Sequence, residues 1–63
     1  MTMSLKAARV NAGLTQAEAA KVLRLSKGTI LSYEKYRTKP DIETAKKIAS
    51  LYGVTVNDIF FAQ

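Results

Sequence analysis

The sequence predicts an all-α fold, with five short helices packed into a single domain that covers residues 1–63. Three observations support this prediction. Apolar residues recur at spacings of three and four positions, the period of a helix with one buried face. Residues that cap or terminate helices stand between these segments. No segment alternates apolar and polar residues over more than about four positions, as a half-buried strand would.

The first two helices are marked by a glycine and by a capping motif. The first is predicted from Met3 to Ala12, and Gly13 suits the left-handed position that follows a helix. The second opens on Thr15-Gln16-Ala17-Glu18, in which threonine and glutamate can satisfy each other's backbone N–H groups as a capping box. It is expected to stop near Arg24, and its apolar face consists of Ala19, Ala20 and Leu23.

Ser26 is expected to cap the third helix, which ends before the loop Tyr36 to Lys39 and Pro40. Gly28 is unusual in its first turn, because glycine costs a helix about 1 kcal/mol relative to alanine. Asp41 is expected to cap a fourth helix that Gly53 terminates. This helix runs from Ile42 to Tyr52, and its predicted apolar stripe is Ile42, Ala45, Ile48, Ala49 and Tyr52. A short fifth helix is expected to start at Thr55 or Val56 and to carry Ile59 and Phe60.

The composition favours an anionic partner. The formal net charge is +5, and four cations, Lys27, Lys35, Arg37 and Lys39, lie close together with Glu34 as the one acid among them. Such a charge suits nucleic acid or a membrane surface. No apolar run is long enough to span a bilayer, and no signal peptide precedes the domain, so we expect a cytoplasmic protein.

The residue types argue against catalysis. The chain has neither cysteine nor histidine, which removes thiolate metal sites and every nucleophile that needs a histidine base. The three tyrosines and the acids at helix starts are better explained by packing and capping. We therefore expect no enzyme, no catalytic residue, no metal, no cofactor and no small-molecule substrate.

The segment from Thr15 to Glu34 has the layout of a DNA-binding helix-turn-helix. A capped helix, a turn of about three residues that contains Leu25, and a second capped helix follow one another. In this motif the first helix braces the second, which enters the major groove. Ala20 must be small where the two helices cross, and Leu25 and Ile30 would bury the turn and the second helix.

The sequence resembles the phage repressor and Cro helix-turn-helix family, whose domains are lambda-repressor-like, in the types and spacing of several residues. The residues that carry the resemblance are Gly13-Leu14-Thr15-Gln16, Glu18-x-Ala20, Leu25-Ser26, Thr29-Ile30, Glu34, Pro40 and the stretch from Gly53 to Phe60. The resemblance covers roughly Leu5 to Phe60. It implies a compact five-helix domain that binds operator double-stranded DNA as a homodimer.

The resemblance also implies roles for single residues. Lys27, Gly28 and Ser32 match positions that touch base edges; Gln16, Thr29, Lys35, Arg37 and Lys39 match positions at the DNA backbone. Arg9 and Glu34 match a structural ion pair. The sequence departs from the family at Arg24 and Tyr36, where glycine is usual, at Ala19, where leucine is usual, and at Leu31, where polar residues are usual. Leu31 and Tyr36 would place apolar surface near the DNA, where it could meet a thymine methyl group or a sugar edge.

An apolar patch of Val56, Ile59 and Phe61 is expected to form the dimer interface. The leading hypothesis is a sequence-specific transcriptional regulator, a repressor of phage or mobile-element type that binds an inverted-repeat operator as a homodimer. Two alternatives stay open: an antitoxin-like autoregulator, and a protein-interaction module on the same fold. The presence of Lys27 and of the basic loop from Lys35 to Lys39 on one face argues against the module, because a surface that binds only protein needs no such charge.

Overall fold

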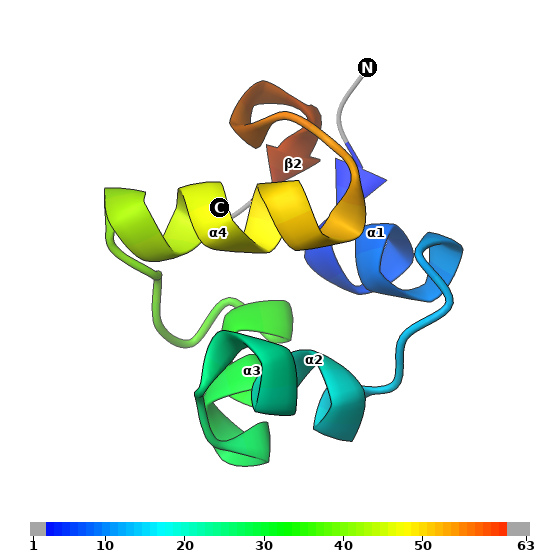
Figure 1. Cartoon of the computed structure of the whole chain (residues 1–63). Coiled ribbons are helices and arrows are strands. Elements are labelled where there is room, and N and C mark those ends of the chain that lie inside the picture. The colour runs from blue at the N-terminus through cyan, green and yellow to red at the C-terminus, as the bar shows by residue number, and fades with distance from the viewer. Residues whose placement is uncertain (1–2, 61–63) are drawn as a thin grey trace.

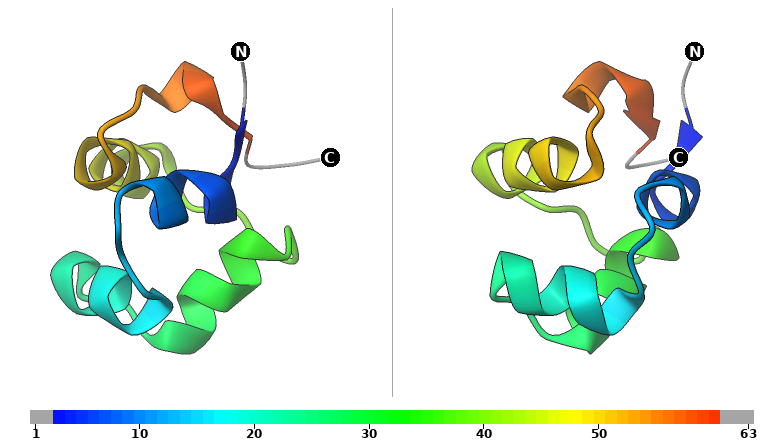
Figure 2. Two further views of the ribbon diagram at one scale, coloured as in Figure 1. Left: turned by 90° about the vertical axis from the view of Figure 1, so that its right-hand side faces the viewer. Right: turned by 45° about the vertical axis from the view of Figure 1, so that its right-hand side comes forward.

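The computed structural model describes residues 3–60, which form four α-helices, a short 3-10 helix and two very short strands. In chain order the elements are β1 (Met3–Ser4), α1 (Leu5–Asn11), α2 (Gln16–Leu23), α3 (Lys27–Glu34), α4 (Ile42–Tyr52), η1 (Val56–Asp58) and β2 (Ile59–Phe60). The helices pack around one core, with α2 and α3 at one end of the molecule and β1 and β2 at the other (Figures 1 and 2).

Side-chain caps set the helix starts. Ser4, Thr15, Ser26 and Asp41 each accept a hydrogen bond from the backbone N–H three residues on, at 2.8–3.1 Å. At α2 the Glu18 carboxylate accepts in return from the N–H of Thr15 at 2.8 Å, so the predicted capping box is confirmed. The caps predicted at Ser26 and Asp41 are confirmed as well. Ser4 was not predicted as a cap, because the first helix was expected to begin at Met3.

Two predictions at the chain's ends are wrong. Met3 and Ser4 are extended rather than helical, and the expected fifth helix is a 3-10 helix of three residues followed by β2. The two strands pair in parallel, with Met3 opposite Ile59 and Ser4 opposite Phe60. A strand of two residues is too short to show a period of two in the sequence, and the pairing depends on a contact between residues far apart in the chain.

The core contains many small residues, which lets short helices approach closely. It consists of Leu5, Ala8, Ala19, Ile48, Ala49, Tyr52 and Ile59, with Ala20, Ile30 and Ala45 buried as well. Ile42 does not belong to it, contrary to the predicted stripe. It is the first residue of α4 and is 62% exposed, because the helix begins beyond the edge of the core.

The turn between α2 and α3 contains a strained residue. Arg24 has φ 57° and ψ 40°, the left-handed conformation that L-residues other than glycine disfavour by about 1–2 kcal/mol. Its backbone N–H donates to the carbonyls of Ala20 and Lys21 and so ends α2. Its side chain is exposed in a groove that Val22 and Lys47 also line. Among the described residues it makes no hydrogen bond or ion pair.

We therefore expect Arg24→Gly to raise the free energy of unfolding by about 1 kcal/mol, because glycine adopts this conformation without strain. Urea denaturation followed by circular dichroism would measure the gain. Arg24→Ala is the matched control, since it removes the same side chain but keeps the strain, and it should leave stability nearly unchanged. A glycine variant no more stable than Arg24→Ala would contradict the strain at this position, and an alanine variant less stable than the unmodified protein would show that the guanidinium stabilises the turn.

Three carboxylates at helix starts link the stability of the caps to pH. Hydrogen bonds with Thr15, Thr44 and Thr55 lower the pKa values of Glu18, Asp41 and Asp58, respectively. A carboxyl whose pKa is lower in the folded state stabilises the fold above its unfolded pKa, about 4, and this contribution is lost as the pH falls through the folded pKa.

Urea denaturation at about pH 3 should therefore give a lower midpoint than near neutral pH. The variant Asp41→Asn still accepts from the N–H of Thr44 but cannot titrate, so it should lose less stability between the two pH values. Equal midpoints for the unmodified protein would contradict this account.

Candidate nucleic-acid interface

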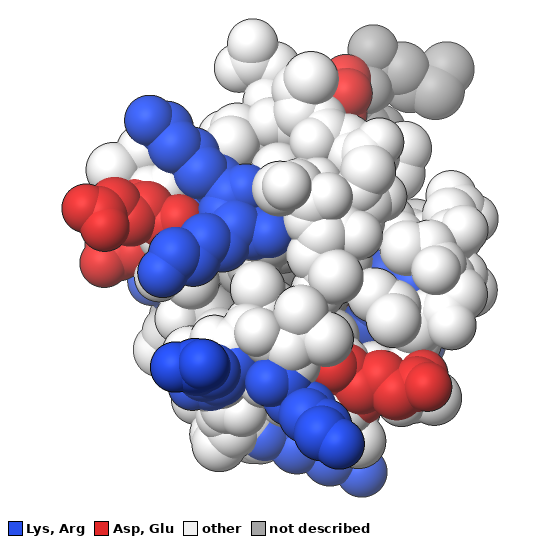
Figure 3. Space-filling view, viewed as in Figure 1, with Lys and Arg blue, Asp and Glu red and all other residues white. Residues whose placement is uncertain are grey.

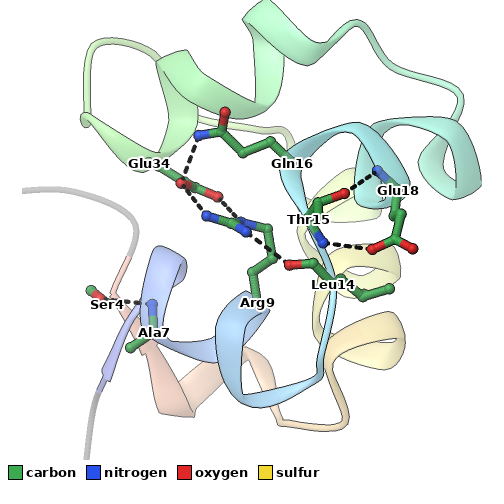
Figure 4. A network of polar contacts seen from close by, with 8 residues as sticks. All are labelled: Ser4, Ala7, Arg9, Leu14, Thr15, Gln16, Glu18 and Glu34. Carbon is green, nitrogen blue, oxygen red and sulfur yellow. Dashed lines mark hydrogen bonds and ion pairs between the residues drawn. The ribbon is translucent and has the colours of Figure 1, made fainter.

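The last residue of α3, Glu34, anchors this helix to the rest of the domain. Arg9 donates to both of its carboxylate oxygens, from Nε to Oε2 at 2.6 Å and from Nη2 to Oε1 at 3.3 Å. Its Nη1 donates to the carbonyl of Leu14 at 2.8 Å, and the Gln16 amide donates to Glu34 Oε1 at 3.1 Å. The network thus joins α1, the following loop and α2 to α3 (Figure 4).

This network is largely shielded from water. The side chains of Arg9 and Glu34 are 9% and 4% exposed. The hydrogen bond to Glu34 raises the pKa of the Arg9 guanidinium, against the opposing effect of burial. Burial also raises the pKa of the neighbouring Tyr52 phenol, and the charge of Glu34 adds to this effect. Arg9 therefore remains charged and paired, and its guanidinium orients α3 instead of facing a ligand.

Lys27 and Gly28 are exposed in the first turn of α3. The helix begins there because the Ser26 hydroxyl accepts from the N–H of Thr29 at 3.0 Å. The hydroxyls of Ser26 and Thr29 also lie 2.8 Å apart, and the Thr29 side chain is half-buried. Of these predicted contact residues, Lys27 thus projects a free cation, whereas Thr29 is partly occupied by the cap.

The segment that follows α3, residues 35–39, is called the basic loop here because Lys35, Arg37 and Lys39 are all exposed. It folds back onto α3. The N–H of Arg37 donates to the carbonyl of Ser32 at 3.0 Å, and the hydroxyls of Ser32 and Thr38 lie 2.9 Å apart. These two contacts hold residues 37 and 38 of the basic loop against the half-buried Ser32, one of the predicted base-reading residues.

Thr38 is a positioning residue that the sequence analysis missed. A hydroxyl residue in a loop is so common that it gives no specific signal, and its partner Ser32 lies six residues earlier, in α3. The role predicted for Gln16 was also incomplete. It was expected at the DNA backbone, and in the structure its half-buried amide donates to Glu34.

Positive charge gathers at the end of the molecule that α2 and α3 form. In Figure 3, lysine and arginine side chains project from this lower part and from one side of α4, while the visible acidic side chains lie towards the edges. Positive charge of this kind, next to an exposed helix face, suits a polyanion such as DNA.

One residue of the predicted dimer patch, Ile59, is buried in the domain itself. Ile59 is 5% exposed and belongs to the core of its own domain, because β2 turns its side chain inward beside β1. It cannot contribute to an exposed apolar surface. Val56 is half-buried and packs against the same core, and Phe61 lies outside the described residues.

Within residues 3–60, no helix combines the length and hydropathy that a membrane span would need. In the same part of the chain, no group of three acidic side chains is arranged to hold a metal ion.

Comparison with known proteins assigns the chain to a family. Residues 5–59 match a family model described as helix-turn-helix. The chain belongs to the helix-turn-helix family. This confirms the resemblance to phage repressors and Cro and the helical helix-turn-helix fold, while the five-helix count is wrong.

Several helix-turn-helix relatives are similar over most of this chain. An uncharacterized HTH-type transcriptional regulator of Methanocaldococcus jannaschii is 42% identical over 60 residues, which cover 95% of this chain and 91% of the relative. The cryptic phage CTXphi transcriptional repressor RstR of Vibrio cholerae is 39% identical over 51 residues, 81% of this chain and 46% of RstR. The HTH-type transcriptional regulator ImmR of Bacillus subtilis is 40% identical over 53 residues, 84% of this chain and 42% of ImmR.

Proposed function

We propose that this helix-turn-helix protein is a sequence-specific DNA-binding transcriptional regulator that inserts α3 into the major groove. One observation carries the proposal: the exposed face of α3 and the cations of the basic loop are held together as one surface by the contact between Ser32 and Thr38. A helix in the groove with cations beside it supplies base readout and phosphate contacts at once. The family and the printed names of its relatives support this choice.

The proposed DNA contacts are of two kinds, contacts to base edges and contacts to the DNA backbone. Lys27 can donate to O6 and N7 of guanine, and Ser32 keeps a further donor or acceptor position beyond its bond to Thr38. Gly28 would bring the backbone close to the bases. The proposed contacts to the DNA backbone are Gln16, Thr29, Lys35, Arg37 and Lys39. Gln16 retains a second amide N–H for a phosphate, since one amide hydrogen bond reaches Glu34.

We further propose that the protein acts in the cytoplasm as a repressor of phage or mobile-element type, a homodimer on an inverted-repeat operator. The relative named a cryptic phage repressor supports this reading. Since Ile59 is in the core, Val56 and Phe61 stay as the proposed residues of the dimer surface. An antitoxin-like autoregulator would use the same DNA contacts, so it stays the alternative.

Selection of bound sites from random double-stranded DNA tests the proposal. We expect enrichment of two inverted half-sites with centres about 34 Å apart, one turn of DNA. Failure to enrich any sequence would contradict sequence-specific binding and favour the protein-interaction module. Enrichment of single, unpaired half-sites would contradict the homodimer while leaving the DNA-binding proposal in place.

Two single variants should separate base readout from phosphate contact. Lys27→Ala is expected to relax the preference at one base pair, where a correct contact is worth about 1–3 kcal/mol. Arg37→Ala should weaken binding to all sequences alike. Competition between operator and unrelated DNA measures both effects. If the two variants lose operator and unrelated DNA in equal proportion, Lys27 does not read a base.

A further inference from the structure

A groove between α2 and α4 takes no part in the proposed DNA contacts. Its volume is about 550 Å³, and it lies where the last turn of α2 faces the second half of α4. The residues that line it are Val22, Leu23, Arg24, Lys47, Ser50 and Leu51. None of them belongs to α3 or to the basic loop, so a ligand in the groove would occupy none of the proposed DNA contacts.

Half of the residues that line the groove are apolar. Leu23 and Leu51 are half-buried and pack against the core, whereas Val22 is 60% exposed. An exposed apolar side chain next to two partly exposed leucines favours a partner that covers them with apolar atoms, because water is then released from all of these surfaces. The groove therefore suits a ligand with an apolar side chain, which a phosphate backbone does not offer.

The charged residues of the groove are all cationic. Arg24 and Lys47 are exposed, and no acidic residue is part of the lining. Neither side chain makes a hydrogen bond or ion pair within the described chain. In Figure 3, cationic side chains project both from one side of α4 and from the part of the molecule that α2 and α3 form. Carboxylates suit such a site, and arginine can hold one through two parallel hydrogen bonds.

The strain at Arg24 is a second sign of a ligand. Its backbone is left-handed, with φ 57°, a conformation that glycine would adopt without strain. The described fold gains no side-chain hydrogen bond or ion pair from having arginine there. Strained residues cluster where proteins bind ligands. The place of Arg24 in the lining of the groove agrees with such a role.

We propose that the groove between α2 and α4 binds a short acidic segment of a partner protein, in which a large apolar side chain stands between carboxylates. The apolar side chain packs on Val22 and Leu51, and the carboxylates pair with Arg24 and Lys47. A second copy of this chain suits the groove less well, because its net charge is +5. The site is separate from the proposed DNA-binding surface and does not depend on it.

Selection from a displayed library of short random peptides, with the full chain as the target, tests this proposal. Enriched peptides should share a large apolar residue with acidic residues on both sides. Fluorescence anisotropy of a synthetic peptide with the consensus sequence then measures affinity. Val22→Ser should weaken binding about tenfold, because it removes most of an exposed apolar contact. Val10→Ser is the matched control and should bind normally, since Val10 is 56% exposed on α1, outside the groove.

A double variant tests the two cations. Arg24→Gln combined with Lys47→Gln should weaken binding of the same peptide about tenfold, the value of two favourable surface ion pairs. Lys6→Gln combined with Lys35→Gln removes equal charge outside the groove and should change the affinity by less than about twofold at physiological salt. A peptide with amides in place of its carboxylates should bind the unmodified protein and the first double variant equally.

Lack of any enriched peptide, or enriched peptides without acidic residues, would overturn the proposal. Equal losses of peptide affinity in the two double variants would overturn it as well, because diffuse positive charge would then explain the binding. The Arg24 and Lys47 double variant should also keep its affinity for the selected operator. A large loss of operator affinity with unchanged peptide affinity would assign the groove to DNA instead.

Discussion

Glu34→Ala is expected to lower the free energy of unfolding by about 3–5 kcal/mol, because it leaves the charge of Arg9 buried without its partner. Arg9 loses two of its three hydrogen bonds, and Gln16 loses its acceptor on α3. A domain of 63 residues has a total stability of roughly 3–9 kcal/mol. The variant should therefore be largely unfolded or close to it, and urea denaturation would show this directly.

A double variant separates the effect of the unpaired charge from that of lost volume. Arg9→Met combined with Glu34→Leu removes both charges and fills the space with apolar atoms, so it should recover most of the lost stability. Glu43→Ala, which removes an exposed acid on α4, is the control and should cost less than about 1 kcal/mol. A double variant as unstable as Glu34→Ala would show that packing around the pair, and not charge, holds α3 in place.

Replacing Lys35, Arg37 and Lys39 together with glutamine is expected to give the largest loss of DNA binding. Each phosphate contact contributes about −0.9 to the slope of log affinity against log salt, so three fewer contacts should make the slope shallower by about 2.7. Operator and unrelated DNA should lose affinity alike. The three side chains are exposed and none makes a described hydrogen bond, so the fold should be unaffected. Fluorescence anisotropy across a range of salt concentrations measures the slope.

A charge-matched control makes this result specific. Lys21, Lys46 and Lys47 are also exposed but lie on α2 and α4, outside α3 and the basic loop. Their replacement with glutamine changes the net charge equally and should alter the slope much less. Equal slopes for the two triple variants would mean that diffuse charge, and not the basic loop, binds the DNA.

Local sequence signals predicted the central part of the fold well. The bounds of α4 agree with the prediction, because Asp41 and Gly53 mark its two ends with chemistry that acts within one turn. The capping box at the start of α2 also agrees, because Thr15 and Glu18 are three residues apart. These features depend on neighbours in the chain, so the residue types alone identify them.

The predictions that were wrong or incomplete concern contacts between segments that are separated in the sequence. β1 and β2 exist only because the two ends of the described chain meet, and Ile59 is buried by that meeting. Apolar residues near the end of a chain look alike whether they serve a core or a partner. The contact between Ser32 and Thr38 was missed for a similar reason: it depends on how the basic loop folds back, which spacing does not show.

The parallel pairing of β1 with β2 has a consequence for how this domain can be combined with others. The two strands lie at the end of the molecule away from α3 (Figures 1 and 2). Because Met3 and Phe60 lie in paired strands, the described part of the chain starts and ends side by side, at the end of the molecule away from the proposed DNA-binding helix. We expect a domain with this geometry to accept added segments next to either strand without covering α3.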